Sequence, residues 1–462
     1  MMLLSEAKRA INAQLIGADV LFTSVGADSR NIVQGQLFVA LKGENFDGYT
    51  FAAQAVKQGA AAVMVANEDA NAEPAVFVKD TYKALGDLAA YWRNKFDIPL
   101  AAITGSNGKT TVKEMLASIL RAASGDAELV LATVGNLNNH IGLPLTLLKL
   151  RAQHQYAVAE MGMNHTGEIS YLSNIGKPTV ALINNAGSAH IGELGSFEAI
   201  AKAKGEIFEG LSADGIAIIN ADDVFAPLWK NLIGTRKTIT FGLKNTADVT
   251  ACYQLQADSS QLDITTPQGL ISVQLPTPGL HNVMNALAAT ATALGMGASL
   301  NNIAEGLVNY TGVKGRLQHL TGLKDTLVID DTYNANPTSV KAAIDVLTAK
   351  LGDKFLVLGD MGELGDDAAE LHAEIGLYAK TAGVNALFTL GELSQEMTHA
   401  FGVGAQHYQS VAMLTADLIA KMHPNSTVLV KGSRFMAMER VVSEIISKSS
   451  NKNEMHKNEE AH

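Results

Sequence analysis

The chain has 462 residues, 47% hydrophobic and 18% charged, so each of about three domains can bury a core and global disorder is excluded. Its 35 Lys and Arg residues against 46 Asp and Glu residues give a net charge of −11, which argues against sequence-independent binding of nucleic acid. The single cysteine, Cys252, excludes an intrachain disulfide, and because we find neither a signal-peptide core nor a membrane span we expect a cytoplasmic protein.

The N-terminal segment has the pattern of a small α/β unit. Short apolar runs predict strands at 37–41, 61–66 and 75–78, and a helix at 51–58 lies between the first two. A longer helix is predicted at 81–96, and a joint follows at 97–99.

Beyond that joint, strands and helices alternate. Strands at 100–103, 156–160, 179–184 and 215–220 argue for a mostly parallel sheet that is covered on both faces. Residues 248–275 instead alternate polar and apolar side chains, as in an antiparallel meander, and a helix follows at 281–294. After a second joint at 311–315, strands alternate with helices again, at 327–330, 355–358, 386–390 and 427–430. The polar residues 451–462 are predicted to be disordered.

The strongest chemical signal is LAAITGSNGKTT at residues 100–111. An apolar strand runs into a glycine-containing turn, a lysine and two hydroxyls at the start of a helix, which is the arrangement of a phosphate-binding loop. Lys109 would reach the β- and γ-phosphates, and the Thr110 hydroxyl could join a Mg²⁺ ion. The common spacing would require glycine where Ile103 stands, and a purely structural turn is the alternative. We expect ATP or GTP to be bound by eight loop residues, Thr104, Gly105, Ser106, Asn107, Gly108, Lys109, Thr110 and Thr111.

Residues 104–111 resemble the variant phosphate loop of the Mur ligases and folylpolyglutamate synthetases, which form amide bonds with ATP. Further segments resemble Mur ligases in matching order: DSR at 28–30, GQLFVALKG at 35–43, NLNNHIGLP at 136–144, EMGMN at 160–164, DDTYNANP at 330–337, LGDMGELG at 358–365 and KGSRFMAM at 431–438. The later segments are similar to the family member that adds D-alanyl-D-alanine. The DNPR segment of the diaminopimelate-adding member does not occur in the sequence.

The resemblance implies an α/β fold of three domains. These are a small α/β UDP-sugar-binding domain at 1–82, a central ATPase domain with the phosphate loop and a mostly parallel sheet at 83–313, and a Rossmann-like C-terminal domain at 314–450. It also implies an ADP-forming ligase that uses ATP and Mg²⁺ to convert the carboxylate of UDP-N-acetylmuramoyl-tripeptide to an acyl phosphate. The amine of D-alanyl-D-alanine would attack it, giving the pentapeptide precursor of peptidoglycan that serves cell shape and cell division. We expect a monomer.

The resemblance also assigns the ATP and metal contacts. Thr110, Glu160 and His190 would bind metal ions, and Asn282 would contact the adenine, with a helix cap as the competing interpretation of that asparagine. Arg316 and Asp331 would reach the phosphates and the ribose from beyond the second joint, so catalysis would require closure about residues 311–315.

Nine further residues are expected to contact the other substrates. For each basic residue among them a solvated surface charge is the alternative. Ser29, Arg30, Lys42 and Gly43 would bind the nucleotide sugar, Asn138 and Asn139 would line the path of the muramoyl peptide, and Lys431, Ser433 and Arg434 would hold carboxylates.

Lys204 has an unusual place in its predicted helix at 198–211. It lies inside the apolar stripe of that helix, whereas Lys202 falls on the opposite face. Burial lowers the pKa of a lysine, and the neutral amine can react with CO₂ to form a carbamate. Mur ligases use a carbamylated lysine in a segment to which AKGEIF at 203–208 is similar, so the resemblance implies that modified Lys204 places a second Mg²⁺ beside His190. The alternative is an unmodified lysine whose amine reaches solvent.

Four other functions compete with the D-alanyl-D-alanine-adding ligase, and the first is another Mur ligase. A folylpolyglutamate synthetase would lack a domain like the first 80 residues. A phosphate-loop switch or motor would hydrolyse ATP without any small-molecule amine, and a noncatalytic UDP-sugar-binding protein would not need the intact phosphate loop.

Overall fold

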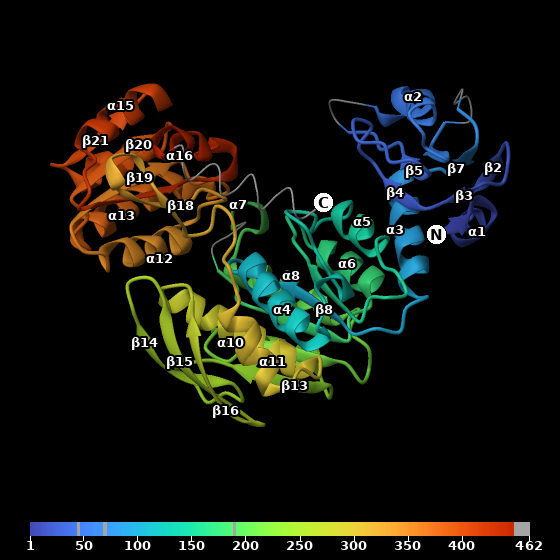
Figure 1. The fold of residues 1–462 in the computed structure, drawn as a ribbon, viewed down its shortest axis with the longest axis horizontal. Helices are drawn as coiled ribbons and strands as arrows, with labels where there is room; N and C mark the ends of the chain where they lie inside the picture. The colour runs from blue at the N-terminus through green and yellow to red at the C-terminus, as the bar shows by residue number, and fades with distance from the viewer. Residues whose placement is uncertain (44–46, 68–71, 188–190, 448–462) are drawn as a thin grey trace.

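The computed structural model describes residues 1–43, 47–67, 72–187 and 191–447. They form three α/β units in chain order, each on its own sheet, with the central unit between the other two (Figure 1). The predicted α/β class with three domains is thereby confirmed. The tail predicted to be disordered at 451–462 lies outside the described residues. Of the helices in the described ranges, none is long and apolar enough to cross a bilayer.

The N-terminal unit has a five-stranded sheet of order β2-β7-β6-β5-β4, parallel except for the β2–β7 pair. The predicted strands are confirmed, but β2 and β4 were not predicted, because they are three residues long and half-exposed and so lack an apolar run. Its elements are β1 (Met2–Leu3), α1 (Leu4–Ala10), β2 (Gln14–Ile16), β3 (Leu21–Phe22), β4 (Ser24–Gly26), β5 (Gln36–Val39), α2 (Ala52–Lys57), β6 (Ala62–Val65), β7 (Ala75–Phe77) and α3 (Thr81–Arg93).

Helix α3 connects the N-terminal unit to the central one. It begins where the Asp80 side chain accepts hydrogen bonds from the backbone N–H groups of Tyr82 and Lys83. Its buried face packs against α1 and against α5 and α6 of the central unit. The boundary predicted at residue 82 falls in the first turn of α3 and stays a prediction.

The central unit is built on six parallel strands in the order β13-β12-β11-β8-β10-β9. The middle strand β8 is buried along its whole length, as its apolar sequence requires. The predicted meander is confirmed as the antiparallel sheet β14-β15-β16. The strands are β8 (Leu100–Thr104), β9 (Val130–Ala132), β10 (Tyr156–Glu160), β11 (Val180–Ile183), β12 (Ile216–Asn220), β13 (Lys237–Phe241), β14 (Thr250–Leu255), β15 (Ser260–Thr266) and β16 (Gly269–Leu275), and the helices are α4 (Lys109–Ser124), α5 (Gly142–Leu147), α6 (Glu168–Gly176), α7 (Ile191–Leu194), α8 (Phe197–Gly205), α9 (Ala226–Ile233), α10 (Leu280–Gly295) and α11 (Leu300–Val308).

The helix predicted at 198–211 is shorter in the structure. Helix α8 ends at Gly205, and a 3₁₀ turn, η3, covers Glu206–Phe208. Tertiary contacts with α6 explain the change, because the Glu206 carboxylate accepts the backbone N–H of Gly167 at 2.8 Å. A Cβ at Gly210 would lie 2.1 Å from the Ser173 carbonyl oxygen, so the chain passes close to α6 directly after η3.

The C-terminal unit has six strands in the order β17-β18-β22-β19-β20-β21, with β17 as the antiparallel edge. Helix α12 starts with a capping box between Asn336 and Ser339, and Pro337 occupies its first turn. Its elements are β17 (Gln318–Thr321), β18 (Leu327–Asp331), α12 (Pro337–Thr348), β19 (Asp353–Gly359), α13 (Ala368–Thr381), β20 (Ala386–Leu390), α14 (Ser394–Phe401), β21 (Ala405–Tyr408), α15 (Val411–Lys421), β22 (Ser426–Lys431) and α16 (Glu439–Ile445). The boundary predicted at residue 313 lies in the segment between α11 and β17 and stays a prediction.

Candidate active site

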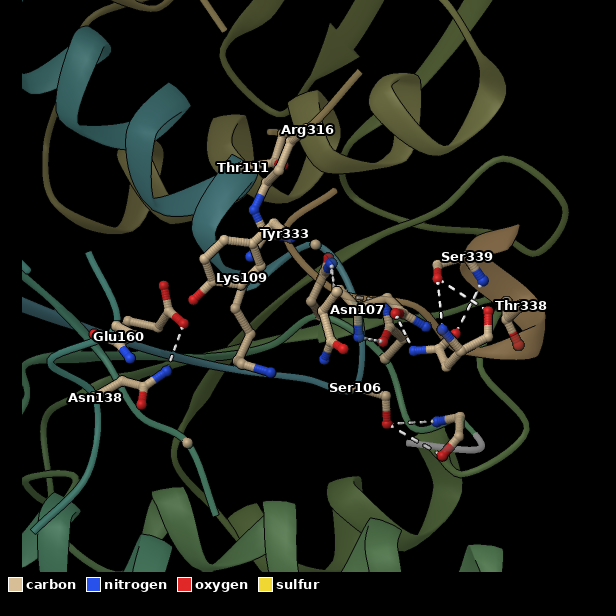
Figure 2. Close-up of a pocket in the computed structure, with 18 of the residues that line it drawn as sticks. Ser106, Asn107, Lys109, Thr111, Asn138, Glu160, Arg316, Tyr333, Thr338 and Ser339 are labelled. Atoms are coloured by element: carbon tan, nitrogen blue, oxygen red, sulfur yellow. Dashed lines mark hydrogen bonds between the residues drawn. The ribbon is translucent and has the colours of Figure 1, made fainter. Parts of the chain in front are cut away.

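A cavity of about 1500 Å³ lies where the central and C-terminal units meet. Its walls come from the phosphate loop, the segments after β10 and β11, the start of α10, the start of α12 and the segments after β19 and β22. Figure 2 shows Lys109 in this wall, with Glu160 and Asn138 to one side and Thr338 and Ser339 of the C-terminal unit to the other. Parallel α/β sheets bind ligands at the carboxyl ends of their strands, and the cavity lies at those ends of both sheets.

The phosphate loop joins β8 to α4, as the sequence predicts. Lys109 is the first residue of α4, and its ammonium donates to the Gly105 carbonyl at 2.7 Å. Burial lowers the pKa of Lys109, and the carboxylate of Glu160 opposes that shift. Gly108 has φ +79°, and a Cβ there would lie 2.3 Å from the Asn285 side-chain oxygen, so only glycine fits.

A network of asparagine amides, which the sequence analysis missed, is hydrogen-bonded to the phosphate loop. The Asn184 amide donates to the Asn107 carbonyl at 2.9 Å and to the side-chain oxygen of Asn285 at 3.2 Å. The side-chain oxygen of Asn185 accepts a hydrogen bond from the Asn107 N–H at 2.8 Å, and the side-chain amide of Asn185 donates one to the Asn107 carbonyl. The signal that could have found them is the pair of asparagines at the end of the strand predicted at 179–184. From the C-terminal unit, Asn336 donates to the Asn107 side chain at 2.7 Å, so the two units meet at this loop.

Glu160 ends β10 and is 2% exposed. Its carboxylate accepts the Thr110 hydroxyl at 3.0 Å and the Asn138 amide at 2.8 Å. Its backbone N–H donates to the buried hydroxyl of Thr133 at 3.0 Å, and the ammonium of Lys113, which is 1% exposed, donates to the Thr133 carbonyl at 2.5 Å. The Glu160 carboxylate is therefore fixed both through its side chain and through its backbone.

We expect Thr133→Val to loosen Glu160 and to destabilise the fold. The variant leaves a buried N–H without an acceptor, which costs about 1–3 kcal/mol of unfolding free energy. Chemical unfolding and the KM for ATP at limiting Mg²⁺ measure the two effects, and the KM should rise. Thr146→Val is the matched control, because the buried Thr146 hydroxyl donates its hydrogen bond to the Gly142 carbonyl within its own helix. Equal KM values in the two variants would contradict this role.

The donors at the phosphate loop suit a magnesium ion. Among the described residues, no three His, Cys, Asp or Glu side chains gather closely enough to hold a metal by themselves. A hydroxyl and a carboxylate oxygen nevertheless lie 3.0 Å apart at Thr110 and Glu160, both buried, and Mg²⁺ in phosphate-transfer sites takes few protein oxygens and completes its shell with phosphate and water. His190, the other predicted metal ligand, lies outside the described residues.

Lys204 is buried as predicted, and Lys202 lies at the surface. Lys204 is 2% exposed, whereas the side chain of Lys202 is 60% exposed and pairs with Glu198 at 2.8 Å. Burial lowers the pKa of Lys204 well below its usual value, and the positive charge of Lys109 lowers it further. The predicted alternative, an amine that reaches solvent, does not fit this burial. Lys204 does not itself line the cavity.

Two predicted nucleotide-binding residues come from the C-terminal side of the second joint. The Arg316 guanidinium donates to the Thr110 hydroxyl at 2.9 Å and stacks over the Tyr333 ring, 4.1 Å from its centroid. Asp331 ends β18, and its carboxylate pairs with the Lys431 ammonium at 2.6 Å. Both Arg316 and Asp331 line the cavity together with the phosphate loop, although they follow it by more than 200 positions.

The other predicted residues that line the cavity have different surroundings. Asn282 lines the cavity, and its amide donates to the Pro278 carbonyl at 2.8 Å, so it does not cap the helix by accepting backbone amides. Lys431 is 3% exposed and so is not a surface charge. Ser433 and Arg434 also line the cavity, and Arg434 pairs with a surface carboxylate. Asn138 and Asn139 lie in the cavity wall beside Glu160.

The residues predicted to bind the nucleotide sugar lie away from this cavity, in the N-terminal unit. Ser29 and Arg30 follow β4, and Lys42 and Gly43 follow β5. Since β4 and β5 are neighbouring parallel strands, both segments lie at the same edge of the sheet, the one formed by the carboxyl ends of these strands. Arg30 is exposed and pairs with Asp28 at 2.9 Å, which lowers the pKa of that carboxyl to about 2.

One aromatic contact connects this edge to the cavity. The Tyr82 hydroxyl donates to the Lys42 carbonyl at 2.8 Å, and its ring lies 5.6 Å from that of His140. His140 belongs to the segment 136–140 that lines the cavity. The sheet edge that carries these four predicted residues and the cavity are therefore joined by contiguous packing.

Three stretches of the chain match domains of known proteins. Residues 21–93 match the catalytic domain of the Mur ligase family, residues 103–293 match the Mur ligase middle domain, and residues 315–434 match the Mur ligase glutamate ligase domain. A relative in Escherichia coli (strain K12), described as UDP-N-acetylmuramoyl-tripeptide–D-alanyl-D-alanine ligase, is 43% identical over 443 residues, which cover 95% of this chain and 97% of the relative. A Bacillus subtilis (strain 168) relative with the same description is 38% identical, over 91% and 93%.

Solved structures agree with these sequence relatives. A crystal structure of MurF from Acinetobacter baumannii superimposes with a TM-score of 0.88 at 39% identity and covers 95% of this chain and 97% of that one. The MurF ligase of Thermotoga maritima, solved in complex with ADP, superimposes with a TM-score of 0.81 at 27% identity, covering 92% and 97%.

Proposed function

This chain belongs to the Mur ligase family, and from that premise we propose how its site adds D-alanyl-D-alanine to UDP-N-acetylmuramoyl-tripeptide. The reaction is an ATP-dependent, ADP-forming ligation of peptidoglycan synthesis. The observation that carries the proposal is the shared cavity, in which the phosphate loop meets Arg316, Asp331 and Asn336 from the C-terminal unit.

The peptide carboxylate must be made reactive before an amine can join it. In our proposal its oxygen attacks the γ-phosphorus of ATP, ADP leaves, and an acyl phosphate forms. The dipeptide amine then attacks the acyl carbon, the carbon–oxygen bond to phosphate breaks, and inorganic phosphate leaves. Lys109 and Arg316 supply positive charge where the transferred phosphoryl group gathers negative charge, which is the main demand that phosphoryl transfer makes on a protein.

The muramoyl substrate would span two units. Its UDP end is proposed to lie at the edge formed by Ser29, Arg30, Lys42 and Gly43, and its peptide would run past His140 and Asn138 to the cavity. The Tyr82 contacts to Lys42 and His140 support this path, because they make the surface between the two ends continuous.

The Mg²⁺ ion is proposed to bind Thr110 and Glu160. When bound it neutralises charge on the phosphates. The chain's own part is to hold the Glu160 carboxylate in place through Thr133 and Asn138 and to exclude water from the site by burial of both ligands.

We further propose that Lys204 is carbamylated. An unmodified ammonium there would be desolvated and repelled by Lys109. The negative charge of a carbamate would instead be attracted to the Lys109 ammonium. The anionic carbamate oxygens would serve, with His190, as ligands of a second Mg²⁺.

We propose that the enzyme works in the cytoplasm. ATP and a UDP-linked precursor are cytoplasmic metabolites, which supports a cytoplasmic enzyme. Activity as a monomer stays a prediction.

Phosphate release should require ATP with Mg²⁺, UDP-N-acetylmuramoyl-tripeptide and D-alanyl-D-alanine together. The physical reason is that the acyl phosphate needs a carboxylate to form and an amine to be consumed. A phosphate-release assay that omits each component in turn measures this. Equal turnover without the dipeptide would indicate a switch or motor, and turnover with meso-diaminopimelate and the dipeptide-stage precursor would indicate a sister ligase.

A further inference from the structure

The antiparallel sheet β14-β15-β16 of the central unit lies outside the site described above. None of residues 250–275, all of which the structure describes, lines the cavity. The turn between β14 and β15 nevertheless contacts the C-terminal unit beside the end of α12 (Figure 1). A contact between these two units matters for the site, because the walls of the cavity come from both of them.

The contact centres on Lys350, which follows α12 and whose side chain is only 5% exposed. Its ammonium donates to the Asp258 carboxylate at 2.5 Å and to the Ala257 carbonyl of the same turn. The hydrogen bond from Lys350 lowers the pKa of Asp258. His319 on β17 faces the same carboxylate, with its Nδ1 3.4 Å from an Asp258 oxygen. One carboxylate of the central unit therefore meets two residues of the C-terminal unit.

Helix α12 connects this contact to the phosphate loop. At the start of the helix, the Asn336 amide donates to the Asn107 side chain at 2.7 Å. Along the helix, the Val346 side chain would lie 3.0 Å from a Cβ at Gly279, so α12 also packs against the segment before α10. The helix has 12 residues and is about 18 Å long. It is therefore attached to the central unit near both ends, and the contact of Lys350 fixes the end that lies away from the phosphate loop.

We propose that Lys350 and Asp258 are positioning residues that hold the C-terminal unit over the phosphate loop. They thereby keep Arg316 and Asp331 in the cavity wall beside that loop. The inference goes beyond the proposed function, because it requires only that ATP binds in the shared cavity. When a site is complete in only a fraction of the molecules, the apparent dissociation constant rises in inverse proportion to that fraction. A weaker contact therefore lowers the affinity for ATP without removing any group that lines the cavity.

Reversal of one charge tests the contact. Asp258→Lys places a second ammonium against Lys350, so the dissociation constant of a nonhydrolysable ATP analogue with Mg²⁺ should rise about tenfold in calorimetric titration. Asp258→Asn, which removes the charge without reversing it, should raise the constant less. In small-angle X-ray scattering without nucleotide, Asp258→Lys should have a larger radius of gyration than wild type.

Asp263→Lys is the matched control for the charge change. Asp263 is exposed on β15, and its carboxylate accepts the Ser272 hydroxyl within the same sheet at 2.6 Å. This variant should bind the analogue as wild type does and should leave the radius of gyration unchanged. A loss of affinity equal to that of Asp258→Lys would show that any added charge on the sheet has this effect, and it would overturn the assignment.

A charge swap separates the ion pair from damage to either side chain. Asp258→Lys combined with Lys350→Glu restores opposite charges and should recover most of the affinity that Asp258→Lys loses, whereas independent effects would add. The single variants change a side chain that is 69% exposed, so their result stands even where the swap does not fold. Unchanged affinity in Asp258→Lys, or a folded swap that binds no better than the single variant, would overturn the assignment. Because both measurements need neither the peptide nor the dipeptide, they remain decisive even if the proposed ligation is wrong.

Discussion

Lys109→Ala is expected to lower kcat for ligation by about 10²–10³-fold, because one preorganised positive charge at a developing anion supplies that much. The lysine is the first residue of α4, and its ammonium lies in the cavity between Glu160 and the C-terminal unit (Figure 2). Steady-state phosphate release with saturating substrates measures the loss. Retention of more than about a tenth of wild-type activity would contradict the role.

The loss should come from chemistry and not from unfolding. The pKa of Lys109 is lowered by burial, so the charge is costly to the folded state and its removal should leave the melting temperature close to wild type. Arg121→Ala, at the far end of the same helix and outside the cavity lining, is the matched control and should keep both activity and stability.

Lys204→Ala is expected to be nearly inactive and to regain activity with a short carboxylic acid such as acetate at high concentration. The added acid would occupy the space of the lost side chain and supply the anionic oxygens of the proposed carbamate. Lys202→Ala, on the exposed face of the same helix, should behave as wild type. Rates measured over a series of acetate concentrations give the result.

A direct signal for the modification complements the rescue. With ¹³C-labelled bicarbonate, the wild-type enzyme should show a carbamate resonance in the NMR spectrum that is missing from Lys204→Ala. An active Lys204→Ala enzyme that is indifferent to added carboxylate, or spectra that do not differ, would rule out the carbamate.

Local signals in the sequence determined the parts of the site that lie close together along the chain. The strand, loop and helix of residues 100–124 follow from an apolar run, two glycines and a helical apolar stripe, and the structure has β8 and α4 there. The buried position of Lys204 follows from the same periodicity, even though α8 ends earlier than predicted. The family resemblance suggested which roles these residues have, but it did not predict which other residues they contact.

The tertiary structure alone decided which distant residues meet. Asn107 and Asn336, Thr110 and Arg316, and Thr133 and Glu160 are hydrogen-bonded pairs whose partners lie far apart in the sequence. No local pattern encodes such pairs, because they depend on the order of strands in each sheet and on how the units pack across the cavity. The end of α8 has the same origin, since the hydrogen bond between Glu206 and Gly167 joins that end to the start of α6.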